Sequence, residues 1–109
     1  MKKFIRSAAR EDILRQHRYL LMKEDRPLAA ERFVSAIRAA IKQVCKMPGI
    51  GAPMLVRNPV LRGLRSWPVT GFTSIRVYYH VFSQDKIRIV RVLHSKQDIR
   101  KILEEESEE

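Results

Sequence analysis

Hydrophobic residues in the first half of the chain recur at the spacing of a helix. Between Ala29 and Val44 they step by one, three or four residues, and polar side chains fill the opposite side. This pattern predicts a helix of about five turns at 3.6 residues per turn. A second apolar stripe, from Ala8 to about Lys23, predicts another helix before it. Because only three or four residues around Pro27 connect the two, we expect an antiparallel helical hairpin.

The second half of the chain changes to a period of two. After two glycines and two prolines at residues 48–53, alternation of apolar and polar positions predicts three strands, at residues 61–66, 73–82 and 87–93. Lys3–Arg6 is expected to form a short first strand, and Lys96–Leu103 a short last helix.

Helices and strands are therefore segregated along the chain, which predicts the α+β class. We expect an N-terminal strand and an antiparallel helical hairpin packed on a three- to four-stranded, mainly antiparallel sheet, with a short C-terminal helix. Since the hairpin covers one face of the sheet, the other face is expected to be free for function and to carry Arg76.

Length and charge narrow the class of partner. A chain of 109 residues allows one domain, which we place at residues 1–103, followed by an acidic tail at 104–109. The net charge is +10, and five of the twelve acidic residues fall in the last six positions, so the body is more basic still. This surplus predicts an acidic partner, but charge alone does not distinguish nucleic acid, a membrane surface and an acidic protein segment.

Cysteine and histidine usage excludes several kinds of chemistry. With the single Cys45 no intramolecular disulfide can form, and no Cys or His run has the spacing of metal ligands. We expect no metal and no cofactor. No apolar run reaches the roughly 20 residues that span a bilayer, so we expect a cytoplasmic protein without a membrane partner.

Several short segments, in this order and spacing, resemble one family over residues 4 to about 99. The chain is similar to toxins of the RelE/ParE superfamily, partners in type II toxin–antitoxin modules. The segments that carry the resemblance are Ala8-Ala9, Asp12-Ile13, Tyr19, Ala30, Phe33, Pro48, Gly51, Leu61-Arg62-Gly63-Leu64-Arg65, Ile75-Arg76-Val77-Tyr78-Tyr79 and Ile87 to His94.

The superfamily contains two activities with different chemical needs. RelE-like members cut mRNA on the ribosome, which requires a base, an acid and cations at the phosphate. On this resemblance Arg65, Arg76 and His94 are the nuclease candidates. However, Ser95 stands where such nucleases commonly have a tyrosine, and Asn58 or Val60 where some carry a glutamate. The ParE-like branch, which inhibits DNA gyrase and has no established catalytic residues, is therefore favoured.

The resemblance also implies partners. The first hypothesis is a ParE-like toxin that binds DNA gyrase and is neutralised by a cognate antitoxin in a hetero-oligomer. The alternative is a metal-independent mRNA endonuclease acting with the ribosome, so enzyme activity stays undecided, leaning to none. A plain nucleic-acid-binding domain is a third, weaker hypothesis. The expected partner-binding residues are Arg62, Arg65, Arg76, Tyr78 and Arg91.

Some of these residues also have a structural interpretation. His94 could cap the junction between the last strand and helix. Arg65 and Arg76 could instead pair with an acid such as Asp98, Asp12 or Glu11 and hold the helices on the sheet.

Overall fold

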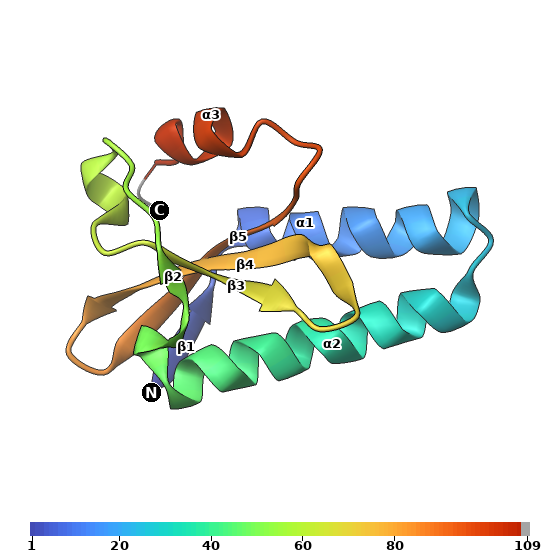
Figure 1. Cartoon of the computed structure of the whole chain (residues 1–109), viewed down its shortest axis with the longest axis horizontal. Coiled ribbons are helices and arrows are strands. Elements are labelled where there is room, and N and C mark those ends of the chain that lie inside the picture. The colour runs from blue at the N-terminus through green and yellow to red at the C-terminus, as the bar shows by residue number, and fades with distance from the viewer. Residues whose placement is uncertain (108–109) are drawn as a thin grey trace.

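The computed structural model describes residues 1–107 and has the predicted α+β architecture (Figure 1). A mixed sheet with strand order β1-β5-β4-β3-β2 forms its centre, and only the β1–β5 pair is parallel. The helices and strands are β1 (Lys2–Ile5), α1 (Ser7–Arg18), α2 (Pro27–Lys46), β2 (Ala52–Pro53), β3 (Arg65–Val69), β4 (Phe72–Ser83), β5 (Lys86–His94) and α3 (Ile99–Glu104).

The predicted helical hairpin is confirmed, with α1 and α2 running in opposite directions (Figure 1). The first helix ends earlier than Lys23, because residues Tyr19–Lys23 form a wider π-helical turn. Asp25 then takes a positive φ of 49° and reverses the chain. Pro27 stands in the first turn of α2, where its missing N–H has no helical partner to lose.

The strand predicted at residues 61–66 is shifted along the chain. Pro59–Leu61 form a 3-10 turn, in which the Asn58 side chain accepts a hydrogen bond from the Val60 backbone. Gly63 follows with a φ of 78°, a conformation that favours glycine and cannot continue a strand. The extended backbone of β3 therefore begins only at Arg65. The sheet also gains β2, a two-residue strand paired with β3, and so has five strands rather than three or four.

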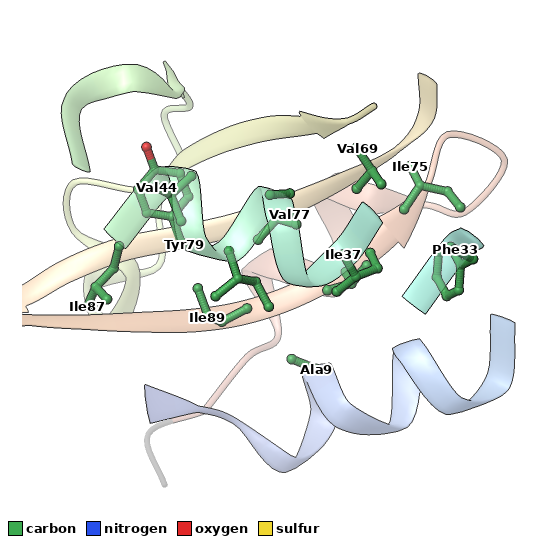
Figure 2. Close-up of a cluster of buried hydrophobic side chains, with 13 residues drawn as sticks. Ala9, Phe33, Ile37, Val44, Val69, Ile75, Val77, Tyr79, Ile87 and Ile89 are labelled. Carbon is green, nitrogen blue, oxygen red and sulfur yellow. The ribbon is translucent and has the colours of Figure 1, made fainter. Parts of the chain in front are cut away.

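The larger core lies between the hairpin and one face of the sheet. Side chains from α2 pack there against β4 and β5, and Figure 2 shows Ile37 and Val44 beside Val77, Tyr79 and Ile89. All of these are nearly inaccessible to solvent. Burial of this apolar surface holds the hairpin on the sheet.

The opposite face of the sheet is not free, which corrects the expectation from sequence. A second core forms there under α3 and the loop before β3, and it contains Leu64, Tyr78, Val90, Leu93 and Leu103. In Figure 1, α3 lies on the side of the sheet away from α2. Arg76 belongs to this face, as expected, but it is half-buried. Near the β4–β5 turn this face is open, and Arg62, His80 and Arg88 line a hollow there.

Two irregularities shift the pairing of β4 and β5. Ser83 pairs with Lys86, but beyond Phe82 the partners move by one residue, so that His80 lies opposite Arg88. The register returns between Tyr79, opposite Ile89, and Tyr78, opposite Arg91. Since neighbouring residues of a strand point to opposite faces, each shift decides which side chains share a face.

Candidate functional site

The sequence-predicted arginines do not gather in one place. Arg65 lies opposite Tyr79 and shares the hairpin face of the sheet with it. Arg76 lies opposite Leu93 on the other face. His94 lies opposite Ile75, four residues along β4 from the partner of Arg65. At about 3.3 Å per residue, these two positions are roughly 13 Å apart along the strand. The structure thus does not bring Arg65, Arg76 and His94 together.

Arg65 holds the loop that follows α2. Its Nη1 donates to the Gly51 carbonyl at 2.7 Å and to the Gly49 carbonyl at 3.3 Å. Tyr79 completes this corner, because its hydroxyl donates to the Pro48 carbonyl at 2.6 Å and accepts from the Gly51 N–H at 2.9 Å. Burial raises the pKa of Tyr79, against the effects of the Gly51 hydrogen bond and the Arg65 charge, so the hydroxyl stays protonated.

Arg76 and Tyr78 make contacts within the second face. The Arg76 Nε donates to the Ser66 hydroxyl at 2.9 Å, and its Nη2 reaches the Ser66 carbonyl at 3.4 Å. Tyr78 is buried against α3. This burial raises the pKa of its hydroxyl, although the positive charge of Arg76 acts in the opposite direction. Neither arginine pairs with Asp98, Asp12 or Glu11 in the structure, which corrects that structural interpretation.

Arg91 carries the strongest electrostatic contacts among the candidates. Its Nε and Nη2 each donate to Asp12 at 2.7 Å, a bidentate pair, and its Nη1 donates to Glu106 at 2.5 Å. The hydrogen bonds that Arg91 donates to Asp12 raise the pKa of Arg91, although burial alone would lower it. Glu106 also accepts from Arg6. Burial raises the pKa of Glu106, but the hydrogen bonds from Arg6 and Arg91 outweigh it and leave that pKa below its ordinary value.

Asp12 also completes the sheet. The backbone pairing of β1 with β5 ends at Ile5, so the next edge groups of β5 have no strand partner. The Asp12 carboxylate accepts from the Val92 N–H at 2.9 Å, and Gln16 Nε2 donates to the Val92 carbonyl at 2.9 Å. Two side chains of α1 thus satisfy backbone groups that β1 leaves unpaired.

The described part of the acidic tail lies against the basic body. Glu104 is the last residue of α3, and its carboxylate accepts from the backbone N–H groups of Arg57 and Asn58. Asn58 in turn donates to the carbonyls of Leu103 and Glu106. Together with the Glu106 pairs, these contacts hold residues 104–107 in place. Residues 108–109 of the predicted tail lie outside the described residues.

His94 borders a hollow of about 540 Å³ between the end of α1 and the β3–β4 turn. Its Nδ1 accepts a hydrogen bond from the Lys96 backbone, which is the capping contact considered from sequence. The walls include Gln16, Tyr19, Leu20 and Phe72. Gln16 Oε1 is buried here without a hydrogen-bond partner. The hollow therefore combines apolar side chains with the charged side chains of Arg15, Glu24 and Arg26.

A cluster that the sequence analysis did not single out lies at the open end of the sheet. Arg88 stacks on Phe82, with its Cζ 4.1 Å from the ring centroid, and its Nη1 lies 3.3 Å from His80 Nε2. Arg62, which is exposed, lines the same hollow as these three residues. The signal in the sequence was the alternation of Arg76, Tyr78 and His80 along one strand face. Without the register shift at Phe82, however, a regular ladder that continues from the Ser83–Lys86 pair would place Arg88 opposite Val81 instead of His80.

Two further findings concern metal ligands and long apolar helices within residues 1–107. No three His, Cys, Asp or Glu side chains among them are grouped as metal ligands. No helix within this range has the length and apolar character needed to cross a membrane.

Comparison with known proteins identifies the class. Residues 4–99 match the family described as the ParE toxin of the type II toxin-antitoxin system parDE, so the chain belongs to the ParE toxin family. Among solved structures it is similar to a chain of the chromosomal ParDE toxin–antitoxin system from P. aeruginosa. That similarity has a TM-score of 0.65 and 19% identity, and it covers 86% of this chain and 95% of the other. Among curated proteins no significant match is found.

Proposed function

We propose that this ParE-family toxin inhibits growth by binding DNA gyrase and is neutralised by a cognate antitoxin. The observation that carries the proposal is the separation of Arg65, Arg76 and His94. RNA cleavage needs acid, base and cations around one phosphate, and these three side chains occupy two faces and two ends of the sheet. Their placement favours the branch that acts by binding over the alternative mRNA endonuclease.

The hairpin end of the molecule is the surface proposed for the antitoxin. Apolar side chains are exposed along it, and Tyr19 and Leu20 continue this surface into the hollow beside His94. An apolar segment of the antitoxin fills the hollow and packs on Tyr19, Leu20 and Phe72. Acidic residues of the same segment complement the basic body. The exposed apolar side chains are Leu14, Tyr19, Leu21, Met22 and Leu28.

The partner-binding residues proposed from sequence differ in how accessible they are. Arg62 is exposed and can contact a partner without rearrangement. Tyr78 is buried under α3, and Arg91 is held by two carboxylates, so each meets a partner only after α3 or the C-terminal segment moves. Arg65 and Arg76 are half-buried. Arg65 donates to the Gly51 carbonyl, and Arg76 donates to the Ser66 hydroxyl.

The proposal places the protein in the cytoplasm, in a hetero-oligomer with its antitoxin, and it requires no metal or cofactor. A supercoiling assay with purified protein and gyrase tests it, run beside a translation extract in which a reporter mRNA is followed. Loss of supercoiling with intact mRNA is expected. Normal supercoiling at saturating protein contradicts the gyrase proposal, and cleaved mRNA supports the nuclease alternative.

The antitoxin surface is tested by Tyr19→Ser, with Leu55→Ser as the matched control. Leu55 is 89% exposed and lies in the loop before β3, away from the hairpin. The Tyr19 variant should bind the antitoxin at least tenfold more weakly, as expected for an aromatic anchor. The Leu55 variant should bind within about twofold of the wild type. Equal effects of the two substitutions contradict the assignment of this surface.

A further inference from the structure

Arg88 is an arginine whose position is fixed by uncharged groups. Phe82 supports one side of its guanidinium, and His80 Nε2 accepts from its Nη1. Within residues 1–107, Arg88 takes part in no ion pair with a carboxylate. The guanidinium is therefore held in position while its charge stays unneutralised, so it can bind an anion.

The protonation of His80 follows from its partners. Its Nδ1 lies 3.0 Å from the Arg62 carbonyl oxygen, which only accepts, so Nδ1 carries the hydrogen. Nε2 is then the acceptor that faces Arg88. Burial lowers the pKa of His80, and the charges of Arg88 and Arg6 lower it further, although the Arg62 carbonyl opposes them. A neutral His80 thus links Arg88 to the backbone of the loop before β3.

Two shallow hollows meet at this arginine. One, of about 510 Å³, is lined by Arg62, His80 and the hydrophobic residues near them. The other, of about 460 Å³, extends toward β1 and is lined by Phe4, Arg6 and Lys86. Phe82 and Arg88 belong to both, and no acidic side chain lines either hollow within the described residues. The two hollows form one basic track across the end of the sheet, and its charge comes from Arg62, Lys86 and Arg88, because Arg6 is paired with Glu106.

Exposed aromatic rings lie along the same track. Phe4 is 41% exposed and Phe82 37% exposed, and their rings meet edge to face with centroids 5.6 Å apart. A cationic groove with rings beside it is the combination that single-stranded nucleic acids use, because phosphates pair with the cations and unpaired bases stack on flat surfaces. A purely acidic peptide needs the cations but not the rings.

We propose that this end of the sheet binds a single-stranded segment of nucleic acid, with Arg88, Arg62 and Lys86 at its phosphates and Phe4 beside an unpaired base. The outer face of the Arg88 guanidinium offers a second stacking plane. This activity goes beyond gyrase binding and uses none of the hairpin surface proposed for the antitoxin.

Fluorescence anisotropy with the full-length protein tests the proposal. The probe is a labelled single-stranded oligonucleotide of about 12 residues, since such grooves cover roughly 4–16 nucleotides. A duplex of the same length and a labelled glutamate-rich peptide are measured beside it, at about 0.15 M salt. Arg88→Gln should weaken oligonucleotide binding about tenfold, and Phe4→Leu about threefold.

Arg38→Gln is the matched control, because Arg38 is exposed on α2 and its loss changes the net charge equally. It should weaken binding less than about twofold. Arg62→Gln and Lys86→Gln repeat the test even if Arg88→Gln misfolds, since neither side chain has an ion pair or hydrogen bond within residues 1–107.

Four outcomes overturn the proposal. They are equal losses for Arg88→Gln and Arg38→Gln, tighter binding of the duplex, an effect of Arg88→Gln on the peptide alone, and no binding of the oligonucleotide. Because no gyrase is present, the result is independent of the supercoiling assay.

Discussion

Arg88 and Arg91 lie close together on β5 but in opposite electrostatic surroundings. Arg91 is neutralised by Asp12 and Glu106 and joins β5 to α1 and to the C-terminal segment. Arg88 is positioned by a neutral histidine and a phenyl ring. A cation enclosed by carboxylates holds the fold together, whereas a cation held by neutral groups keeps its charge for a partner. In a protein of net charge +10, this difference separates structural arginines from candidate binding arginines.

Removing the main carboxylate of the Arg91 site should give the largest loss of stability. Asp12 is 1% exposed and accepts hydrogen bonds from Arg91 and from the Val92 backbone. Asp12→Ala leaves a partly buried cation and an edge N–H without this acceptor, so we expect the free energy of unfolding to fall by about 3–5 kcal/mol. Urea unfolding measures this change.

The neighbouring Glu11→Ala is the control for Asp12→Ala, because Glu11 is exposed. It should change stability by no more than about 0.5 kcal/mol. Arg88→Gln should also cost little, about 1 kcal/mol or less, because it removes hydrogen bonding to a neutral partner. A loss as large for Arg88→Gln as for Asp12→Ala contradicts the division between the two arginines.

Arg65 provides a third environment, in which the guanidinium donates to two backbone carbonyls. A Cβ on Gly51 lies 2.5 Å from the Tyr79 hydroxyl and 2.8 Å from the Ser66 carbonyl oxygen. Gly51→Ala therefore displaces the loop that Arg65 and Tyr79 hold, and we expect a loss of about 2 kcal/mol. Thermal or urea unfolding measures it. At Gly49 a Cβ meets no atom within 4 Å, so Gly49→Ala should be close to neutral.

The sequence predicted the elements whose periodicity is strong. The stripe from Phe33 to Val44 and the alternation along β4 gave α2 and the central strands correctly, because burial of one face imposes these patterns. The start of β3 was wrong, since the 3-10 turn after Asn58 and the positive φ of Gly63 depend on local hydrogen bonds. The cover over the second face was missed because α3 is short and its partners lie far away in sequence.

The candidate site was less predictable than the fold. The positive charge of Arg91 and its place on a strand identified it as a candidate. Its pairing with Asp12 could not be predicted, because the two residues come from opposite ends of the chain. The cluster around Arg88 depends on a one-residue shift at Phe82, and hydrophobic alternation does not reveal where a bulge falls. Sequence patterns therefore gave the faces of the strands but not the pairs of side chains on them.

Glu106 allows a test of the Arg91 ion pairs with a smaller expected effect. Glu106→Gln keeps the shape of the side chain but removes the charge that Arg6 and Arg91 share. We expect a loss of about 1 kcal/mol near neutral pH, whereas Glu105→Gln, at an exposed position, should be neutral. Because the pKa of Glu106 lies below its ordinary value of 4.5, its contribution is present above that pH and is lost as the pH falls further. Unfolding curves measured across the acid range should show this dependence in the wild type and less of it in the variant.

His80 gives the smallest effect and the sharpest test of the surroundings of Arg88. Its pKa is lowered from 6.5 in the folded protein, mainly by burial, so below that pH the unfolded chain takes up a proton that the folded chain does not. Stability is therefore full above about pH 6.5 and decreases as the pH falls through that value toward the lowered pKa. Denaturant titrations near neutral and mildly acidic pH should show this decrease in the wild type and not in His80→Gln. In Arg88→Gln the decrease should be smaller but still present, because one of the cations that lower the pKa is gone while burial remains. A decrease of the same size in His80→Gln as in the wild type contradicts the neutral His80 on which the position of Arg88 depends.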